Sequence, residues 1–175
     1  MSITSRFLLP TAVLAFSLAS SATVDAATRA LTTNQNPGAV CQLSIPTTDT
    51  QVRPKATGFR NESTTKSAFV LCGNVMPTND GTTSIEIDFT SMDGVARTIS
   101  CTGVNGFPGI FAPSYSTKTV SSTANGTTAY LLWTPADFSG EDEIPYGYAP
   151  SITCTLPPQT AIAMVTNRSL LEIGN

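Results

Sequence analysis

The chain has 175 residues, a formal net charge of −3 at pH 7, 12% charged residues and no histidine. This mildly acidic balance argues against nucleic acid or an anionic membrane surface as the main partner. The lack of histidine excludes Ser-His-Asp and Cys-His catalysis and the common catalytic zinc sites.

The first 26 residues have the pattern of a secretory signal peptide. Arg6 supplies a positive charge, residues 7–18 are apolar, and residues 24–26 form a small-residue cleavage site. The apolar run is shorter than the roughly 20 residues that a membrane-spanning helix needs. We therefore expect a cleaved signal at 1–26 and a single domain at 27–175, secreted or periplasmic, with no membrane span in the mature chain.

Four cysteines remain after the signal: Cys41, Cys72, Cys101 and Cys154. An even number of cysteines in an exported chain predicts two disulfides, and four cysteines allow three pairings. We favour Cys41–Cys72 and Cys101–Cys154 because the chain divides naturally into those two halves.

The first segments of the domain are predicted as short strands and edges. Residues 27–39 are polar and indicate a flexible leader or an edge segment, and residues 40–45 indicate a strand. Residues 51–61 contain Pro54, which cannot donate a hydrogen bond to a sheet, so an edge or bulged strand is expected. The continuous apolar run at 68–72 predicts a central strand buried on both faces.

Residues 83–101 give the strongest hairpin signal in the chain. Apolar and polar residues alternate on both sides of a turn at Asp93-Gly94. A three-residue loop that ends at Gly94 pairs Ile87 with Ile99 and keeps the apolar side chains on one face. A two-residue loop would instead set charged side chains against apolar ones.

A second hairpin is predicted at 116–134 around the Asn-Gly pair at 125–126, a preferred tight-turn sequence. Trp133 lies inside a strand pattern and is expected in the core. Strands at 151–156 and 161–166 close the domain. Together these segments predict an all-β fold: a two-sheet sandwich, Ig-like or similar, of eight or nine short antiparallel strands with two disulfides.

The long loop at 135–150 is the most unusual local feature. Its candidate ligand-binding residues are Asp137, Glu141, Asp142, Glu143, Tyr146 and Tyr148. The four carboxylates could hold calcium, although their spacing is not that of an EF-hand, and paired carboxylates also perform glycoside hydrolysis. The two tyrosines suggest a glycan- or protein-binding platform. A solvated acidic loop is the plainer interpretation, and apart from calcium we expect no cofactor.

Half of the basic residues of the mature chain lie in one short window, at Arg53, Lys55, Arg60 and Lys66. These charges could meet the acidic loop of another copy, which would permit self-association. The plainer interpretation is that charges on an edge strand prevent unwanted sheet pairing. Ser63 and Lys66 also match the S-x-x-K pattern, but their polar surroundings favour a simple turn.

The layout, an export signal followed by a disulfide-bearing β-domain, is similar to that of bacterial pilins, coat-type subunits and small periplasmic proteins. Residues 27–39 lack the alternating apolar residues of a donor strand, so donor-strand assembly is not expected. We predict a non-catalytic binding or interaction domain that displays its long loops to a protein or glycan ligand. The alternative is a structural subunit of a cell-surface assembly. A hydrolase that uses carboxylates alone ranks third because the acids cluster in one loop.

Overall fold

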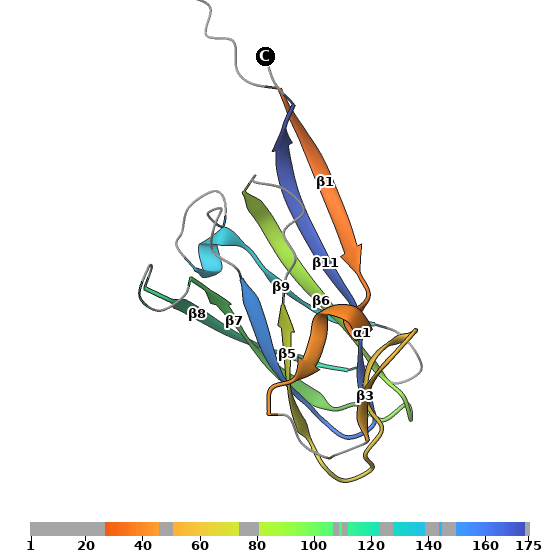
Figure 1. Ribbon diagram of the computed structural model, residues 1–175. Coiled ribbons are helices and arrows are strands. Elements are labelled where there is room, and N and C mark those ends of the chain that lie inside the picture. The colour runs from red at the N-terminus through yellow and green to blue at the C-terminus, as the bar shows by residue number, and fades with distance from the viewer. Residues whose placement is uncertain are drawn as a thin grey trace, which may run out of the picture.

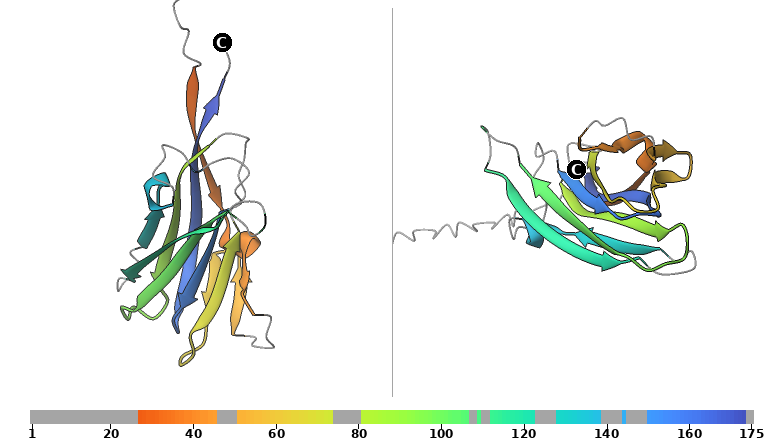
Figure 2. Two further views of the ribbon diagram at one scale, coloured as in Figure 1. Left: turned by 90° about the vertical axis from the view of Figure 1, so that its left-hand side faces the viewer. Right: turned by 90° about the horizontal axis from the view of Figure 1, so that it is seen from below.

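The structure, a computed structural model, describes residues 27–45, 51–73, 81–106, 109, 112–122, 128–138, 144 and 150–173. These residues form two antiparallel β-sheets that pack face to face (Figures 1 and 2). The predicted all-β two-sheet sandwich is confirmed. The predicted signal peptide at 1–26 lies outside the described residues. No helix in the described part of the chain is long and apolar enough to cross a membrane.

Sheet A has six strands in the order β3-β4-β11-β6-β9, with β1 paired to β11. Its strands are β1 (Thr28–Gln35), β3 (Val52–Lys55), β4 (Gly58–Asn61), β6 (Thr82–Ser91), β9 (Ala129–Trp133) and β11 (Thr160–Glu172). Sheet B has five strands in the order β2-β5-β10-β7-β8. Its strands are β2 (Cys41–Leu43), β5 (Ala68–Gly73), β7 (Thr98–Asn105), β8 (Ser114–Ser121) and β10 (Ser151–Leu156). Two short turns complete the described structure, α1 (Pro37–Val40) and the 3-10 turn η1 (Pro135–Asp137).

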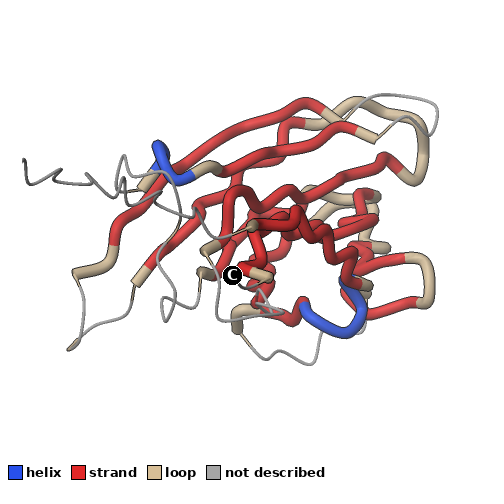
Figure 3. The backbone as a smooth tube through the Cα atoms, turned by 90° about the horizontal axis from the view of Figure 1, so that it is seen from above, coloured by secondary structure: helices blue, strands red, loops and turns tan. Residues whose placement is uncertain are grey.

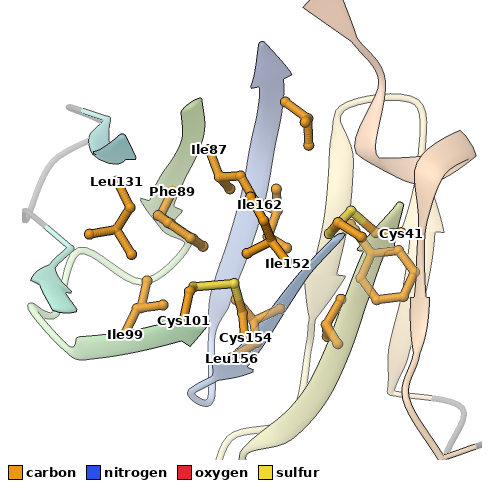
Figure 4. Close-up of a cluster of buried hydrophobic side chains, with 14 of the residues drawn as sticks. Cys41, Ile87, Phe89, Ile99, Cys101, Leu131, Ile152, Cys154, Leu156 and Ile162 are labelled. Carbon is orange, nitrogen blue, oxygen red and sulfur yellow. A yellow bond between two sulfur atoms is a disulfide. The ribbon is translucent and has the colours of Figure 1, made fainter. Parts of the chain in front are cut away.

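The core lies between the sheets, where alternate residues of each strand point inward (Figure 4). Trp133 is the largest fully buried side chain, with 0% exposure, and its Nε1 donates a hydrogen bond to the carbonyl of Ser116 at 3.0 Å. Gly103 makes room for this ring, because a Cβ there would lie 2.8 Å from Trp133 Nε1 and 3.0 Å from Cζ of Phe138. The prediction that Trp133 belongs to the core is confirmed.

Both disulfides connect neighbouring strands of sheet B. Cys41 on β2 is bonded to Cys72 on β5, and Cys101 on β7 is bonded to Cys154 on β10. In each case the two residues lie directly opposite each other in the strand register. The favoured pairing is therefore confirmed, and four of the five strands of sheet B are covalently linked in pairs.

The predicted hairpin at 83–101 is wrong, and residues 92–97 separate its two strands in place of the predicted three-residue loop. β6 lies in sheet A and β7 lies in sheet B, so Ile87 and Ile99 enter the core from opposite sheets instead of pairing side by side. The connection still turns at Gly94, which has a left-handed φ of 75°. Asp93 fixes this turn: its carboxylate accepts hydrogen bonds from Arg97 at 2.6 Å, and these hold the pKa of Asp93 well below its usual range.

The predicted second hairpin is wrong for the same reason. β8 pairs with β7 in sheet B, whereas β9 pairs with β6 in sheet A. The Asn-Gly pair at 125–126 lies outside the described residues. Alternation predicted correctly which side chains point inward. It did not determine the partner strand, because two consecutive strands bury their apolar faces equally well as neighbours in one sheet or in opposite sheets. Here the chain crosses from one sheet to the other.

One further strand prediction needs correction. β5 is central in sheet B, as expected, but it is buried on one face only, and Phe69 on its outer face is 58% exposed. Of the two alternatives for residues 27–39, the edge segment is confirmed: the segment contains a regular strand, β1, which pairs with the last strand, β11, along its whole length. A mostly polar strand can form here because one face and one edge remain open to solvent.

Candidate functional site

The chain has two long loops, one expected at 102–114 and one at 135–150, and the strand registers place the described ends of both at the same end of the sandwich. Figure 3 shows the strands of both sheets and the two helical turns in a view from above. The register of β7 with β8 places Asn105 opposite Ser114, where the first loop leaves and returns. The second loop leaves after β9 and returns at Ser151, which lies opposite Val104 of β7. Strands from both sheets therefore present the two loops together.

Asp137 begins the second loop and has a structural role in the described residues. Its carboxylate accepts hydrogen bonds from Lys118 Nζ and from the backbone N–H of Thr134, both at 2.8 Å. Burial alone would raise the pKa of Asp137, but the hydrogen bonds from Lys118 and Thr134 outweigh it and hold the pKa below its ordinary value. Lys118 also donates to the carbonyl of Leu132 at 2.7 Å, so this ion pair joins β8 of sheet B to β9 of sheet A.

Ile144 anchors the middle of the same loop. It is fully buried, and its backbone N–H donates to the carbonyl of Thr82 at 2.8 Å at the start of β6. The other predicted ligand-binding residues lie outside the described residues: Glu141, Asp142, Glu143, Tyr146 and Tyr148. Their roles in ligand or calcium binding stay predictions. The described part of the chain contains no group of three or more His, Cys, Asp or Glu side chains placed to hold a metal.

A second surface, which the sequence analysis did not identify, lies on the outer face of sheet B. Two rows of hydroxyl side chains cross its strands β10, β7 and β8. One row is Thr153, Thr102 and Thr117, and the other is Thr155, Ser100 and Thr119. The Oγ1 atoms of Thr102 and Thr117 are 2.8 Å apart and share a hydrogen bond. We call these six residues, together with Tyr115, the hydroxyl face.

Tyr115 gives the hydroxyl face an aromatic ring at its loop end. It lies on β8, opposite Val104 of β7, and is 66% exposed. Thr117 is the next residue along β8 whose side chain points to the same face. The outward positions of β5, β7, β8 and β10 carry no charged side chain, since Lys118 lies on the inward phase of β8. The signal was present in the alternating polar residues of these strands, but only the sheet order shows that they form one surface.

The outer face of sheet A is charged instead. Arg168 on β11 forms an ion pair with Glu86 on β6 at 2.9 Å. Asp88, two residues further along β6, is only 7% exposed. Burial raises the pKa of Asp88, the neighbouring Glu86 raises it further, and Arg168 partly offsets both. Tyr130, opposite Asp88 on β9, is 57% exposed.

The basic window lies at the far side of sheet A and is paired within the chain. Glu62 accepts ion pairs from Arg53 at 3.1 Å and Lys55 at 3.6 Å. Ser63 is buried, and its Oγ accepts the backbone N–H of Lys66 at 2.9 Å, the geometry of a polar turn. The Ser63 contact is that of the simple turn expected from the sequence. The role of the basic residues, in preventing sheet pairing or in self-association, stays a prediction.

No protein-family model matches the chain, and no curated protein matches it. Among solved structures, a family 11 carbohydrate-binding module from Clostridium thermocellum, in complex with a β-1,3-1,4-mixed-linked tetrasaccharide, matches with a TM-score of 0.35 and 9% sequence identity. The match covers 86% of this chain and 89% of that chain. A similarity at this level carries no functional argument.

Proposed function

We propose that this protein is a secreted or periplasmic, non-catalytic binding domain that holds a neutral glycan chain against the hydroxyl face. One observation carries the proposal: an exposed tyrosine stands beside two rows of hydroxyls on a surface without charged side chains. The two disulfides are typical of proteins from oxidising compartments.

The chemistry of the face suits a neutral polyol. Each Ser or Thr hydroxyl can donate one hydrogen bond and accept two, as the hydroxyls of a sugar do. Neighbouring strands lie about 4.8 Å apart and outward residues on one strand about 6.8 Å apart, so the hydroxyls form a regular grid. An exposed tyrosine ring offers an apolar surface on which a pyranose ring can stack. No charged group has to be desolvated when a ligand covers this face.

The position of the disulfides supports the same role. Cys101, on β7, and Cys154, on β10, lie directly beneath the hydroxyl face and tie two of its three strands together. A rigid surface loses little conformational entropy when it binds, so more of the contact energy appears as affinity.

The proposal is tested by isothermal titration with a panel of soluble neutral polysaccharides, a glucan, a xylan and a mannan, against the anionic polygalacturonate. We expect a neutral polymer to bind and Tyr115→Ala to weaken that binding at least tenfold. Tyr130→Ala is the matched control, because Tyr130 is an equally exposed strand tyrosine on the opposite face. Absence of binding to every neutral polymer, or equal loss in both variants, would overturn the proposal.

The acidic loop remains a second proposal, since Ser151, where the described chain resumes after it, is aligned through Val104 with Tyr115 of the hydroxyl face. We expect the double variant Tyr146→Ala, Tyr148→Ala to keep its melting temperature while ligand capture is lost. A large loss of stability would instead make these tyrosines core residues. A rise in melting temperature with excess calcium would support a metal-organised loop, and an unchanged value would remove calcium from the proposal.

A further inference from the structure

We propose that the free edge of β1 pairs with β1 of a second copy, which joins the two sheets A about a twofold axis. The inference is independent of glycan binding, because it concerns the opposite sheet and needs no ligand. It identifies a surface for self-association that differs from the basic window and the acidic loop.

The direction of the backbone groups along β1 follows from one contact. The N–H of Ile173 donates to the carbonyl of Ala27 at 2.9 Å, so the two residues form a hydrogen-bonded pair at the start of the ladder. In an antiparallel ladder such pairs alternate, and the residues between them direct N–H and C=O away from the partner strand. The residues whose backbone N–H and C=O point to the free edge are therefore Thr28, Ala30, Thr32 and Asn34. Among the described residues, no strand lies beyond this edge (Figure 1).

The other described edges of the sandwich are protected. β3 has only four residues, among them Arg53, Pro54 and Lys55, and β2 has three residues. β8 and β9 approach each other, and Lys118 of β8 donates to the backbone of Leu132 in β9. Short strands, prolines and charges are the usual means of preventing edge pairing.

β1 has none of these protections. It is eight residues long, its register with β11 runs without a shift, and Arg29 is its only charged residue. A long, regular and nearly uncharged edge is a template for another strand.

The N-terminal end of β1 belongs to a two-stranded ribbon that further strands would stabilise. The strand pairing of β11 with β6 ends at Ser169 and Thr82, and Leu170 still donates a backbone hydrogen bond to Gly81 at 3.4 Å. Further out, β1 is the only described strand that pairs with β11, and the two strands project past the other described strands (Figures 1 and 2). This ribbon carries Leu170, Leu171 and Ile173, the last 57% exposed. A two-stranded ribbon alone is marginally stable in water, and a third and fourth strand from a second copy would extend it into a sheet.

The sequence of β1 suits pairing with itself. Residues whose backbone groups point to the free edge must pair with the same kind of residue in the second copy. The register that uses the whole strand therefore pairs Thr28 with Asn34 and Ala30 with Thr32. In this register Leu31 lies opposite Leu31 of the second copy. This register places Leu31 against Leu31 on the core side of the sheet. It also keeps the two Arg29 side chains about 13 Å apart along the strands, so their charges do not oppose the contact.

The first test is the molar mass of the exported protein by light scattering after size-exclusion chromatography, between 1 and ~200 µM and without glycan. We expect a concentration-dependent dimer. Ala30→Pro and Thr32→Pro each remove one backbone N–H that points to the free edge, and each should shift the protein to monomer. The melting temperature should change little, since an edge strand tolerates proline at a position whose N–H has no partner strand. Thr32→Val keeps the N–H and should stay dimeric. A monomer at every concentration, or a ladder of larger multimers, would overturn the proposal.

A second test is needed because a proline variant could misfold. Leu31→Cys should form an intermolecular disulfide under mild oxidation, because the residue faces its own copy across the axis at about 4.5 Å between Cα atoms. Arg29→Cys is the control on the same strand and the same side of the sheet, and it should not cross-link. Equal cross-linking of both variants would contradict this register and with it the twofold contact.

Discussion

The two outer faces of this sandwich differ sharply, although the strands that form them have the same inward pattern. Sheet A carries Glu86, Asp88 and Arg168 on its outer surface, whereas the outward positions of the four main strands of sheet B carry no charge. Both sheets contribute similar apolar side chains to the core (Figure 4). Core packing therefore constrains one residue in two, and the residues between are free to specialise.

The sheets also differ in their covalent bonds. Both disulfides link strands of sheet B, and in the described residues sheet A is held by backbone hydrogen bonds and side-chain contacts alone. A rigid, uncharged sheet and a charged sheet with an open edge suit different tasks.

The largest expected effect comes from removing the covalent difference. Replacing Cys101 and Cys154 by Ala should lower the free energy of unfolding by roughly 4 kcal/mol, because the bridge spans 53 residues and restricts the unfolded chain. The bridge between Cys41 and Cys72 spans 31 residues, and its removal should cost roughly 0.5 kcal/mol less. Urea unfolding of the two double variants measures both values. A loss below ~1 kcal/mol in both would show that sheet B does not depend on its disulfides.

The next effect concerns the ion pair that links the two sheets. Asp137→Asn should lower stability at pH 7 by about 1–2 kcal/mol, since it removes the charge that Lys118 contacts. The folded-state pKa of Asp137 lies below its ordinary value, so its contribution is complete above pH ~4 and is lost as the pH falls through the lowered value. Thermal unfolding from pH 7 to pH 2 should show the two curves converging at low pH. A difference that stays constant as the pH falls from 7 to 2 would contradict the assignment.

Asp88 on the charged face should behave in the opposite way. Its pKa is raised by burial, so the ionised form destabilises the fold, and this cost is absent at low pH, where the carboxyl is protonated in both states. Asp88→Asn should raise stability at pH 7 by ~0.5 kcal/mol, similar to relief of a like-charge contact on a sheet. The gain should vanish near pH 3. A variant that is less stable at pH 7 would mean that the carboxylate has a favourable partner.

The smallest effect on stability is expected on the hydroxyl face. Thr102→Val breaks the hydrogen bond to Thr117 but keeps a β-branched residue on an outer strand position, so the free energy of unfolding should change by less than ~0.5 kcal/mol. Glycan titration of the same variant should show weaker binding if the face is the binding surface. A large loss of stability would mean that the hydroxyl rows are needed for the fold rather than for a ligand.

The sequence by itself determined which side chains enter the core. Alternation identified Ile85, Ile87 and Phe89 as inward residues, and all three are fully buried. It also placed Trp133 in the core. These features are local, because the period of a strand is two and a side chain's phase does not depend on its partner. The correct disulfide pairing followed from a different argument, the division of the chain into two halves.

Only the tertiary structure decided which strands lie side by side. Both predicted hairpins cross between the sheets, since an apolar strand face is buried equally well by a lateral neighbour or by the opposite sheet. The hydroxyl face and the free edge of β1 depend on this choice. The first joins Thr102, Thr117 and Thr153 from three strands, and the second exists because β1 pairs with the far end of the chain. Such long-range partners leave no signal in local periodicity, because periodicity records the faces of a strand and not its neighbours.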